Sequence, residues 1–437
     1  AHAANGFYLS PFKKSAILTA DSMGEDDSAN FLIGEKNKLK LIKRLKIPHS
    51  TGSFYSTFTE FFGYRPESDE WKVMALSAYG KKNNKFYKII REMVSLKSNG
   101  SFELDQSYFK QHIYRTLNFY TDEFVKIIGK PREKNQNFTK RNFDIAAAMQ
   151  QVFEEICSHM LKFLYSKTRM KNLVLSGGSF MNSVFNGKAH KLTPFNNVWI
   201  SSCPDDSGLS IGAALYLYNN ILQKKTRYEL KHNFLGPNYS SDKIKKVLIK
   251  YKVKFKYEKN ITQIISQELA RGKLVGWFQG RMEFGQRALG NRSILADPRD
   301  KNSKVKVNQA VKYRESFRPF APAVIDKYAY QYFDLVKGEK IPFMEKVVMV
   351  RKEKRNIIPA VVHKDFTARV QTVENQTNKI FYNLINDFYK KTGVPILLNT
   401  SFNLNGEPIV CSPTDAIRTF YSCGLDILVM DNFIVYK

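Results

Sequence analysis

Two strand–turn–helix units constrain the fold of this chain more than any other feature of its sequence. The first is the apolar run LVLS at 173–176, followed by Gly177 and Gly178. The second is NVWISSCP, followed by the turn DDSG and a helix of small residues. Strands that alternate with helices are typical of an α/β sheet, which binds its ligands at the carboxyl ends of the strands. The sequence therefore predicts an α/β fold with a site at these two turns.

The segments around these units give further predictions. SAILTAD predicts a buried strand that ends at Asp21, and the following ANFLIGEKNKLKLIKRLKI alternates like a hairpin. Apolar residues at helical spacing predict one long amphipathic helix over 143–167. Residues 81–141 are rich in Lys and Asn and predict peripheral helices. Towards the end of the chain we expect a strand at PILLNTS, a helix from Thr414 and a terminal strand.

The length of 437 residues exceeds one ordinary hydrophobic core, so we expect more than one domain. The segment KHNFLGPNYSSDK carries Gly236, Pro237 and a cluster of Ser and Asn, which is typical of a boundary. We therefore predict two domains, at 1–232 and 233–437.

The stretch 279–324 is rich in arginine and is interrupted by glycine and proline. Guanidinium groups bind phosphate and carboxylate oxygens through paired hydrogen bonds, and glycines let backbone amides approach the same oxygens. The pattern predicts a pocket for a small polyanion, and a basic surface loop is the alternative. The basic residues are Arg281, Arg287, Arg292, Arg299, Lys312, Arg314 and Arg318.

The charge balance of the chain limits the classes of binding partner that we expect. The chain has 69 basic and 40 acidic residues, a net charge of +29, which favours anionic partners. Much of the excess is lysine dispersed along the chain, and no nucleic-acid-binding module is recognisable, so we expect no nucleic-acid partner. Four scattered cysteines lack zinc-ligand spacing, and no apolar run reaches the ~18–20 residues of a membrane span. With no signal peptide, we expect a cytoplasmic protein.

Three residues of the first domain could ligate a metal ion. His2, Asp21 and Asp206 offer an imidazole and two carboxylates, which suit a divalent ion such as Fe, Mn, Zn or Mg. The alternatives are a surface or core histidine and an aspartate that caps a turn. Gly177 and Gly178 could let a nucleotide phosphate or ribose lie against bare backbone, or could serve tight strand–helix packing.

The second domain offers polar side chains at strand ends. Thr367, Arg369 and Gln371 alternate as on a strand, and LLNTSFN supplies Asn399, Thr400, Ser401 and Asn403. The four residues of LLNTSFN are neutral donors and acceptors that could orient a carbamoyl or carboxylate group, and an Asx or ST turn is the alternative interpretation. Because no Ser-His-Asp or Cys-His arrangement stands out, covalent catalysis is not our first hypothesis.

Together these motifs resemble the O-carbamoyltransferase family of nodulation-factor and antibiotic biosynthesis, the NodU-like enzymes. The resemblance covers essentially the whole chain in order. It implies an actin-like (ASKHA, ribonuclease H-like) domain followed by a YrdC-like α/β domain. The motifs that carry it are AHAA, EWKVMALSAYG, LSGGSFMNSVFNGK, PDDSGLSIGAAL, QGRMEFGQRALGNRSILADPR, NQAVKYRESFRPFAPAV, DFTARVQTV and PILLNTSFNLNGEPIV.

In such enzymes the YrdC-like domain converts carbamoyl phosphate and ATP to carbamoyl-adenylate. The actin-like domain then transfers the carbamoyl group to a hydroxyl of a sugar-containing or secondary-metabolite acceptor. The resemblance implies the following roles: catalysis by Lys312, Arg318 and Arg287, binding of the donor and ATP by Arg369, Ser401, Asn399, Thr400 and Arg314, a nucleotide site at Gly177, Gly178 and Asn182, and a divalent metal held by His2, Asp21 and Asp206.

The sequence departs from the family pattern at its start. The family has a further histidine ligand four residues before the position of His2, and a histidine base nearer the native start, and neither is in this sequence. We therefore expect a first site that is one ligand short. A threonylcarbamoyl-tRNA modification enzyme and an actin-like sugar kinase are the alternatives. The sequence does not identify the acceptor molecule, and we expect the acceptor pocket in loops such as 81–141. The oligomeric state is open too, with a homodimer as the candidate.

Overall fold

The structure is a computed structural model that describes all residues except 114–117, 313–314 and 316. Arg314, which the resemblance implied in donor or ATP binding, lies outside the described residues. The chain forms two compact units, Ala1–Leu230 and Lys231–Lys437, which are described separately below as the first and second units. The domain boundary expected after residue 232 falls beside this division. Across the described ranges, no helix is both long and apolar enough to cross a membrane.

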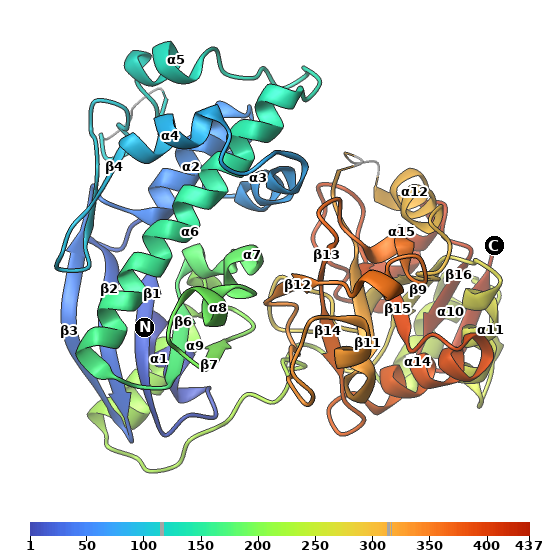
Figure 1. Cartoon of the computed structure of the whole chain (residues 1–437). Helices are drawn as coiled ribbons and strands as arrows, with labels where there is room; N and C mark the ends of the chain where they lie inside the picture. The colour runs from blue at the N-terminus through green and yellow to red at the C-terminus, as the bar shows by residue number, and fades with distance from the viewer. Residues whose placement is uncertain (114–117, 313–314, 316) are drawn as a thin grey trace. The chain divides into compact units, whose positions relative to one another are not determined.

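The first unit is built on a five-stranded sheet in the order β3-β2-β1-β6-β7 (Figure 1). The antiparallel half comprises β1 (Lys14–Ala20), β2 (Asp27–Glu35) and β3 (Lys38–Lys46). The parallel half adds β6 (Asn172–Ser176) and β7 (Asn197–Ile200) to β1. The strand expected before Asp21, the hairpin after it and both strands of the strand–turn–helix units are confirmed.

Helices cover both faces of this sheet. The long helix expected over 143–167 is α6 (Lys140–Thr168), and its Phe163 ring packs edge-on against Phe31 of β2 at 5.8 Å. Leu32, the next residue of the same strand, packs against the side-chain cluster of α1 (His2–Tyr8) that includes Phe7. Because successive strand residues point to opposite faces, α6 and α1 lie on opposite sides of the sheet. Helix α9 (Leu209–Leu215) packs beside α1.

The sequence predicted helices for the region 81–141, but the described part of this region also contains strands. Between α4 (Lys85–Glu92) and α5 (Asp122–Ile128) it forms a hairpin, β4 (Val94–Leu96) and β5 (Phe102–Leu104). Val94, Phe102 and Leu104 are buried, so tertiary packing of short apolar pairs outweighs the polar composition of the segment. Two further helices precede it, α2 (Thr51–Phe61) and α3 (Glu70–Leu76).

The second unit contains an eight-stranded mixed sheet in the order β14-β11-β15-β10-β9-β16-β17-β8. Its central strands are buried along their whole length, because helices such as α14 (Lys379–Thr392) and α15 (Pro413–Tyr421) pack on the sheet. The strands are β8 (Lys256–Tyr257), β9 (Val275–Phe278), β10 (Arg292–Ala296), β11 (Ala321–Ile325), β14 (Gln371–Val373), β15 (Ile396–Ser401), β16 (Ile427–Met430) and β17 (Phe433–Tyr436).

Several sequence predictions for this unit are confirmed. The strand expected at PILLNTS is β15, the helix expected from Thr414 is α15, and the terminal strand is β17. The alternating segment with Thr367, Arg369 and Gln371 spans two strands, β13 (Thr367–Arg369) and β14. β13 pairs with β12 (Val347–Met349) in a separate two-stranded sheet.

Candidate functional site

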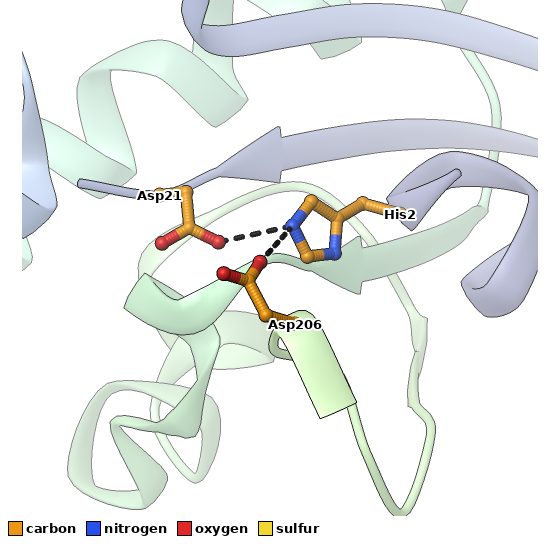
Figure 2. A group of neighbouring side chains, drawn as sticks. All are labelled: His2, Asp21 and Asp206. Atoms are coloured by element: carbon orange, nitrogen blue, oxygen red, sulfur yellow. Dashed lines mark ion pairs between the residues drawn. The ribbon is translucent and has the colours of Figure 1, made fainter. Parts of the chain in front are cut away.

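Three side chains from distant parts of the first unit converge on one point (Figure 2). His2 belongs to α1, Asp21 directly follows β1, and Asp206 opens the short 3-10 turn Asp206–Gly208. The Nε2 atom of His2 lies 3.0 Å from Asp21 Oδ2 and 3.3 Å from Asp206 Oδ1. The three candidate metal ligands of the sequence therefore form one cluster, with their ligand atoms within 4.8 Å of one another.

The Gly-Gly turn after β6 holds Asp21 in place. β1 and β6 are parallel neighbours, so their carboxyl ends meet at one edge of the sheet. The Gly178 N–H donates to Asp21 Oδ2 at 2.8 Å, and the Ser22 N–H donates to Oδ1 at 2.8 Å. A Cβ on Gly177, whose φ is +98°, would lie 2.2 Å from the Ala20 carbonyl oxygen. The turn therefore requires glycine for packing against the Asp21 strand, whatever it also binds.

The environment of Asp21 keeps its carboxylate ionised. Burial acts to raise the pKa of this group, but hydrogen bonds from His2, Gly178 and Ser22 outweigh it and hold the pKa below its ordinary value. A carboxylate that is anionic and fixed by two backbone amides is preorganised to accept a cation.

The donor set fits a divalent ion. Nε2 of His2 faces two carboxylate oxygens, and a single N–H can serve only one of them well. Nδ1 of His2 is buried, and among the described residues it has no hydrogen-bond partner. One imidazole nitrogen with two carboxylate oxygens suits Fe, Mn, Zn or Mg. These three side chains could therefore hold such an ion between them.

We expect Gly178→Ala to weaken the binding of a divalent ion by about tenfold or more, as disturbing a group that orients a ligand typically does. The added Cβ would lie 2.8 Å from Asp21 Oδ1, so the carboxylate must shift away from His2. Titration of the purified protein with Mn²⁺ or Fe²⁺ measures the affinity. An affinity equal to that of the wild type would show that the turn does not position Asp21.

Asn182, predicted in the nucleotide site, has its side chain engaged within the protein. Its Oδ1 accepts from the Phe185 N–H at 2.9 Å and so caps α7 (Ser183–Asn186). Its Nδ2 donates to Gln150 Oε1 at 2.9 Å, in a buried network with Tyr55. Asn182 therefore shapes the turn that follows the glycines, and a direct contact with a nucleotide stays a prediction.

In the second unit Lys312 and Ser401 lie together. Lys312 is buried, and its Nζ lies 2.7 Å from the Ser401 carbonyl oxygen and 3.3 Å from its Oγ. It also lies 2.9 Å from the Asn403 carbonyl oxygen and 2.6 Å from Asn403 Oδ1. Four oxygens around one ammonium fix its position at the end of β15. Thr400 directly precedes Ser401 on β15 and points to the other face of the strand.

A second group of contacts brings the Arg287 loop beside β14 and β15. Asn399 Nδ2 donates to the Ala288 carbonyl oxygen at 3.2 Å and to Gln371 Oε1 at 3.0 Å. Gln371 Nε2 donates to the Leu289 carbonyl oxygen at 2.8 Å. Arg287 precedes these two anchored residues, and Arg369 lies two residues before Gln371. The structure thus gathers the segments of Arg287, Arg369 and Asn399 at one end of the sheet.

Arg318 is buried, with its Nε 2.7 Å from Glu315 Oε2. It lies six residues after Lys312, in the segment that leads into β11. An ion pair with a partly exposed carboxylate can be exchanged for one with an anionic ligand, so this contact is compatible with the predicted role.

Three other arginines of the 279–324 stretch correct the prediction that the whole stretch forms a polyanion pocket. Arg292 is fully buried, lies 3.6 Å from the Phe278 ring centroid and donates to the carbonyl oxygens of Gln279 and Asn291. Arg299 pairs with Asp297 at 2.6 Å, and Arg281 donates to carbonyl oxygens in the 235–236 segment. These guanidinium groups serve the fold, because each is engaged by acceptors of the protein itself.

Sequence reasoning missed Glu283, a buried carboxylate inside the basic stretch. Its Oε1 accepts from the backbone N–H groups of Leu289 at 2.6 Å, Asn291 at 2.9 Å and Arg292 at 3.3 Å. Burial raises the pKa of this group against the effect of these hydrogen bonds. Glu283 therefore ties together the loop that carries Arg287. In sequence it resembles an ordinary counter-charge to its basic neighbours, so no local signal singles it out.

Sequence reasoning also missed His363. Burial, together with the charges of Arg369 and Lys304, lowers the pKa of this imidazole to about 4, although Asp365 opposes the shift. Its Nδ1 lies 3.0 Å from Thr367 Oγ1, and its Nε2 has no hydrogen-bond partner among the described residues. A neutral imidazole beside Arg369 can accept or donate one hydrogen bond to a ligand. The adjacency to Arg369 arises in the fold and has no periodic signature.

We expect Glu345→Gln to change the pH dependence of unfolding. Burial, opposed by Lys346, raises the pKa of the Glu345 carboxyl from 4.5 to about 7. Below pH 4.5 the group is protonated in both states, and above pH 7 the folded state bears the full cost of ionisation. The wild type should therefore lose up to about 2–3 kcal/mol between these pH values relative to the variant.

Chemical denaturation of both proteins from pH 4.5 to pH 8 measures this difference. The exposed Glu353 in the same unit provides the matched control, Glu353→Gln. A difference between wild type and Glu345→Gln that is constant across this range would contradict the assignment.

Comparison with known proteins identifies the family. The family model described as carbamoyltransferase N-terminus matches residues 1–215, and the one described as carbamoyltransferase C-terminus matches residues 266–437. Nodulation protein NolO of Bradyrhizobium diazoefficiens is 34% identical over 100% of this chain and 78% of its own length. Nodulation protein NolNO of Sinorhizobium fredii is 36% identical over 100% of this chain and 63% of its own length.

A relative with a named activity matches more distantly. 3'-Hydroxymethylcephem-O-carbamoyltransferase of Streptomyces clavuligerus is 26% identical over 94% of this chain and 77% of its own length. Among solved structures, full-length HypF in its phosphate- and nucleotide-bound form matches at a TM-score of 0.27 and 18% identity, over 51% of this chain and 35% of that chain. So low a score supports no statement about the fold. The domain matches and the NolO relationship show that this chain belongs to the carbamoyltransferase family, as the sequence motifs indicated.

Proposed function

We propose that this protein is an ATP-dependent O-carbamoyltransferase whose two units carry out successive half-reactions. In the second unit, water releases phosphate from carbamoyl phosphate, and a carbamate oxygen attacks the α-phosphorus of ATP. Pyrophosphate leaves and carbamoyl-adenylate forms. In the first unit, an acceptor hydroxyl attacks the carbamoyl carbon, the acceptor loses its proton, and AMP leaves.

The observation that carries this proposal is the placement of Lys312 among the oxygens of Ser401 and Asn403. Carbamoyl phosphate and ATP together carry several negative charges, so their reaction needs fixed positive groups that require little reorganisation. Lys312 is held by the protein itself, and Arg287, Arg318 and Arg369 would complete the charge around the reacting phosphates. Asn399, Thr400 and Ser401 would orient the carbamoyl or nucleotide group.

The first unit supports the second half-reaction. Its sheet order, with three antiparallel strands followed by two parallel ones, supports an actin-like (ribonuclease H-like) domain. Gly177 and Gly178 would place the adenylate against the turn after β6. A divalent ion held by His2, Asp21 and Asp206 would supply a Lewis acid for the carbamoyl oxygen. Asp21 would keep that position because Gly178 and Ser22 fix its carboxylate.

The acceptor atom is proposed from a relative. The name of the Streptomyces protein states that it carbamoylates an oxygen, which supports a hydroxyl as the acceptor here. A sugar-containing molecule or secondary metabolite would carry that hydroxyl. The assignment of the second unit as YrdC-like belongs to the same proposal.

Release of AMP and pyrophosphate from ATP tests the proposal. We expect the purified chain to release pyrophosphate only when carbamoyl phosphate is present. ATP turnover that ignores carbamoyl phosphate and yields ADP would instead support a sugar kinase. Carbamoyl-phosphate-dependent turnover that requires tRNA and threonine would support a threonylcarbamoyl-type enzyme.

A further inference from the structure

A small polar pocket lies beside Asp21 in the first unit. Its polar lining comes from Ser22, Ser53, Glu67 and Gln111, and Met23 and Pro48 provide apolar walls. These residues come from five separate parts of the chain: the turn after β1, the loop after β3, α2, the segment before α3 that carries Glu67, and the segment after β5 that carries Gln111. The volume open to a water-sized group is about 20 Å³, enough for roughly one hydroxyl or ammonium group.

Gln111 leaves hydrogen-bonding capacity unused at this pocket. Both its amide nitrogen and its amide oxygen are buried, and neither has a hydrogen-bond partner in the structure described for this chain. A buried polar group without a partner destabilises the folded state, by about 1–3 kcal/mol for a typical group. A ligand hydroxyl, which both donates and accepts, would satisfy either half of this amide.

The other polar atoms of the lining determine which ligand charge the pocket favours. Ser22 Oγ lies 3.3 Å from Ser53 Oγ and 3.5 Å from Glu67 Oε1. Glu67 holds a left-handed φ of +60°, and its N–H donates to Glu70 Oε1 at 2.6 Å, so its backbone is fixed. The lining contains this carboxylate but neither lysine nor arginine, and its remaining titratable group is His112. A carboxylate prefers hydroxyl and ammonium donors and repels anions.

We infer that this pocket receives one hydroxyl or ammonium group of the acceptor, and that it thereby selects a neutral or amino-substituted polyol ring over an acidic one. The identity of the ring as acceptor rests on the proposed function. Ser22 links the pocket to the candidate metal cluster, because its N–H donates to Asp21 Oδ1 at 2.8 Å while its side chain lines the pocket. A hydroxyl bound there is adjacent to the group that would hold the carbamoyl-activating ion.

The pocket is expected to prefer basic over acidic sugars, which is the opposite of the preference that the net charge of the chain would give. A net charge of +29 alone would favour an acidic sugar over a basic one. Binding is therefore tested with glucosamine, glucose and glucuronate, three sugars that differ chiefly in charge. Ligand-observed NMR titrations at about pH 7, where an amine with a pKa near ~7.7 is mostly protonated and an ordinary imidazole is mostly neutral, give the affinities without ATP or carbamoyl phosphate.

We expect glucosamine to bind most tightly and glucuronate least tightly. Glu67→Gln should lower the preference for glucosamine over glucuronate by roughly three- to tenfold, the size of an interaction with one partly exposed charge. Gln111→Leu should lower the affinity for glucose as well, because it removes the side-chain amide that would bond to a sugar hydroxyl. The exposed Glu92 provides a matched control, Glu92→Gln, which should behave as the wild type.

Two results would overturn the inference: glucuronate binding most tightly to the wild type, or Glu67→Gln retaining the wild-type preference. Absence of measurable binding of any of the three sugars to the wild type would overturn it too. The pyrophosphate assay on the wild type stands apart from these titrations. Sugar selectivity without carbamoyl-phosphate-dependent turnover would refute the proposed function and leave the pocket, whereas turnover without selectivity would refute the pocket alone.

Discussion

Lys312→Met is expected to reduce carbamoyl-phosphate-dependent pyrophosphate release by at least about a hundredfold, the loss typical of removing one preorganised group that stabilises a transition state. The ammonium is buried and held by oxygens of Ser401 and Asn403, so it cannot be replaced by a mobile surface lysine. Methionine keeps the length and volume of the side chain while it removes the charge. Steady-state pyrophosphate release at saturating ATP measures the effect.

The loss must be separated from damage to the fold. Lys246→Met alters an exposed lysine of the same unit and should leave pyrophosphate release unchanged. Thermal unfolding of Lys312→Met shows whether the variant is folded at the assay temperature. Ser401→Ala keeps the lysine and removes one hydroxyl, so it should raise the KM for carbamoyl phosphate more than it lowers kcat. A folded Lys312→Met protein with near-normal turnover would refute the assignment of Lys312 to the phosphate site.

Asp21→Asn is expected to abolish divalent-ion binding at this cluster and, with it, the proposed carbamoyl transfer to an acceptor. The carboxylate is the one member of the cluster that two backbone amides fix, and it faces His2 at 3.0 Å. Loss of a direct ligand should exceed the roughly 10–100-fold effect of losing a group that only orients a ligand. Elemental analysis after dialysis measures the ion, and mass spectrometry of the acceptor measures transfer.

Asp26→Asn provides the matched control, because Asp26 is an exposed residue of the same turn and pairs with Lys46. It should retain the ion content of the wild type. Asp21→Asn should lower transfer much more than it lowers pyrophosphate release, since the proposed mechanism assigns adenylate formation to the second unit. Unchanged ion content in Asp21→Asn would remove Asp21 from the ligand set.

The local pattern of the sequence predicted most elements of both units. The apolar run before Asp21 is β1, the helical spacing over 143–167 is within α6, and the runs at LVLS and PILLNTS are β6 and β15. Such patterns record which side of a segment is buried, and that information is local. The hairpin β4–β5 was missed because its two short strands depend on burial of Val94, Phe102 and Leu104 against the rest of the unit.

For the candidate sites too, the sequence indicated which residues to consider, and only the fold showed what surrounds them. Residue type and position made His2, Asp21 and Asp206 candidates for a metal site, and the predicted roles of Lys312 and Ser401 came from the resemblance to the family. The sequence could not show which arginines of the basic stretch serve the fold. Arg292 is buried against Phe278, and Arg299 is paired with Asp297. These partners depend on which groups the fold places nearest to each guanidinium.

By itself, the sequence determined the α/β class, the order of the elements and the residue types at the two turns of the first unit. Only the tertiary structure brought His2 to within 3.3 Å of both Asp21 and Asp206, and placed Gln111 beside Ser22. The physical reason is that a hydrophobic period fixes a segment's buried face, whereas a polar side chain's partner depends on which distant segment packs next to it. Glu283 and His363 acquired their surroundings in that way, so their pKa shifts and contacts could be found only in the fold.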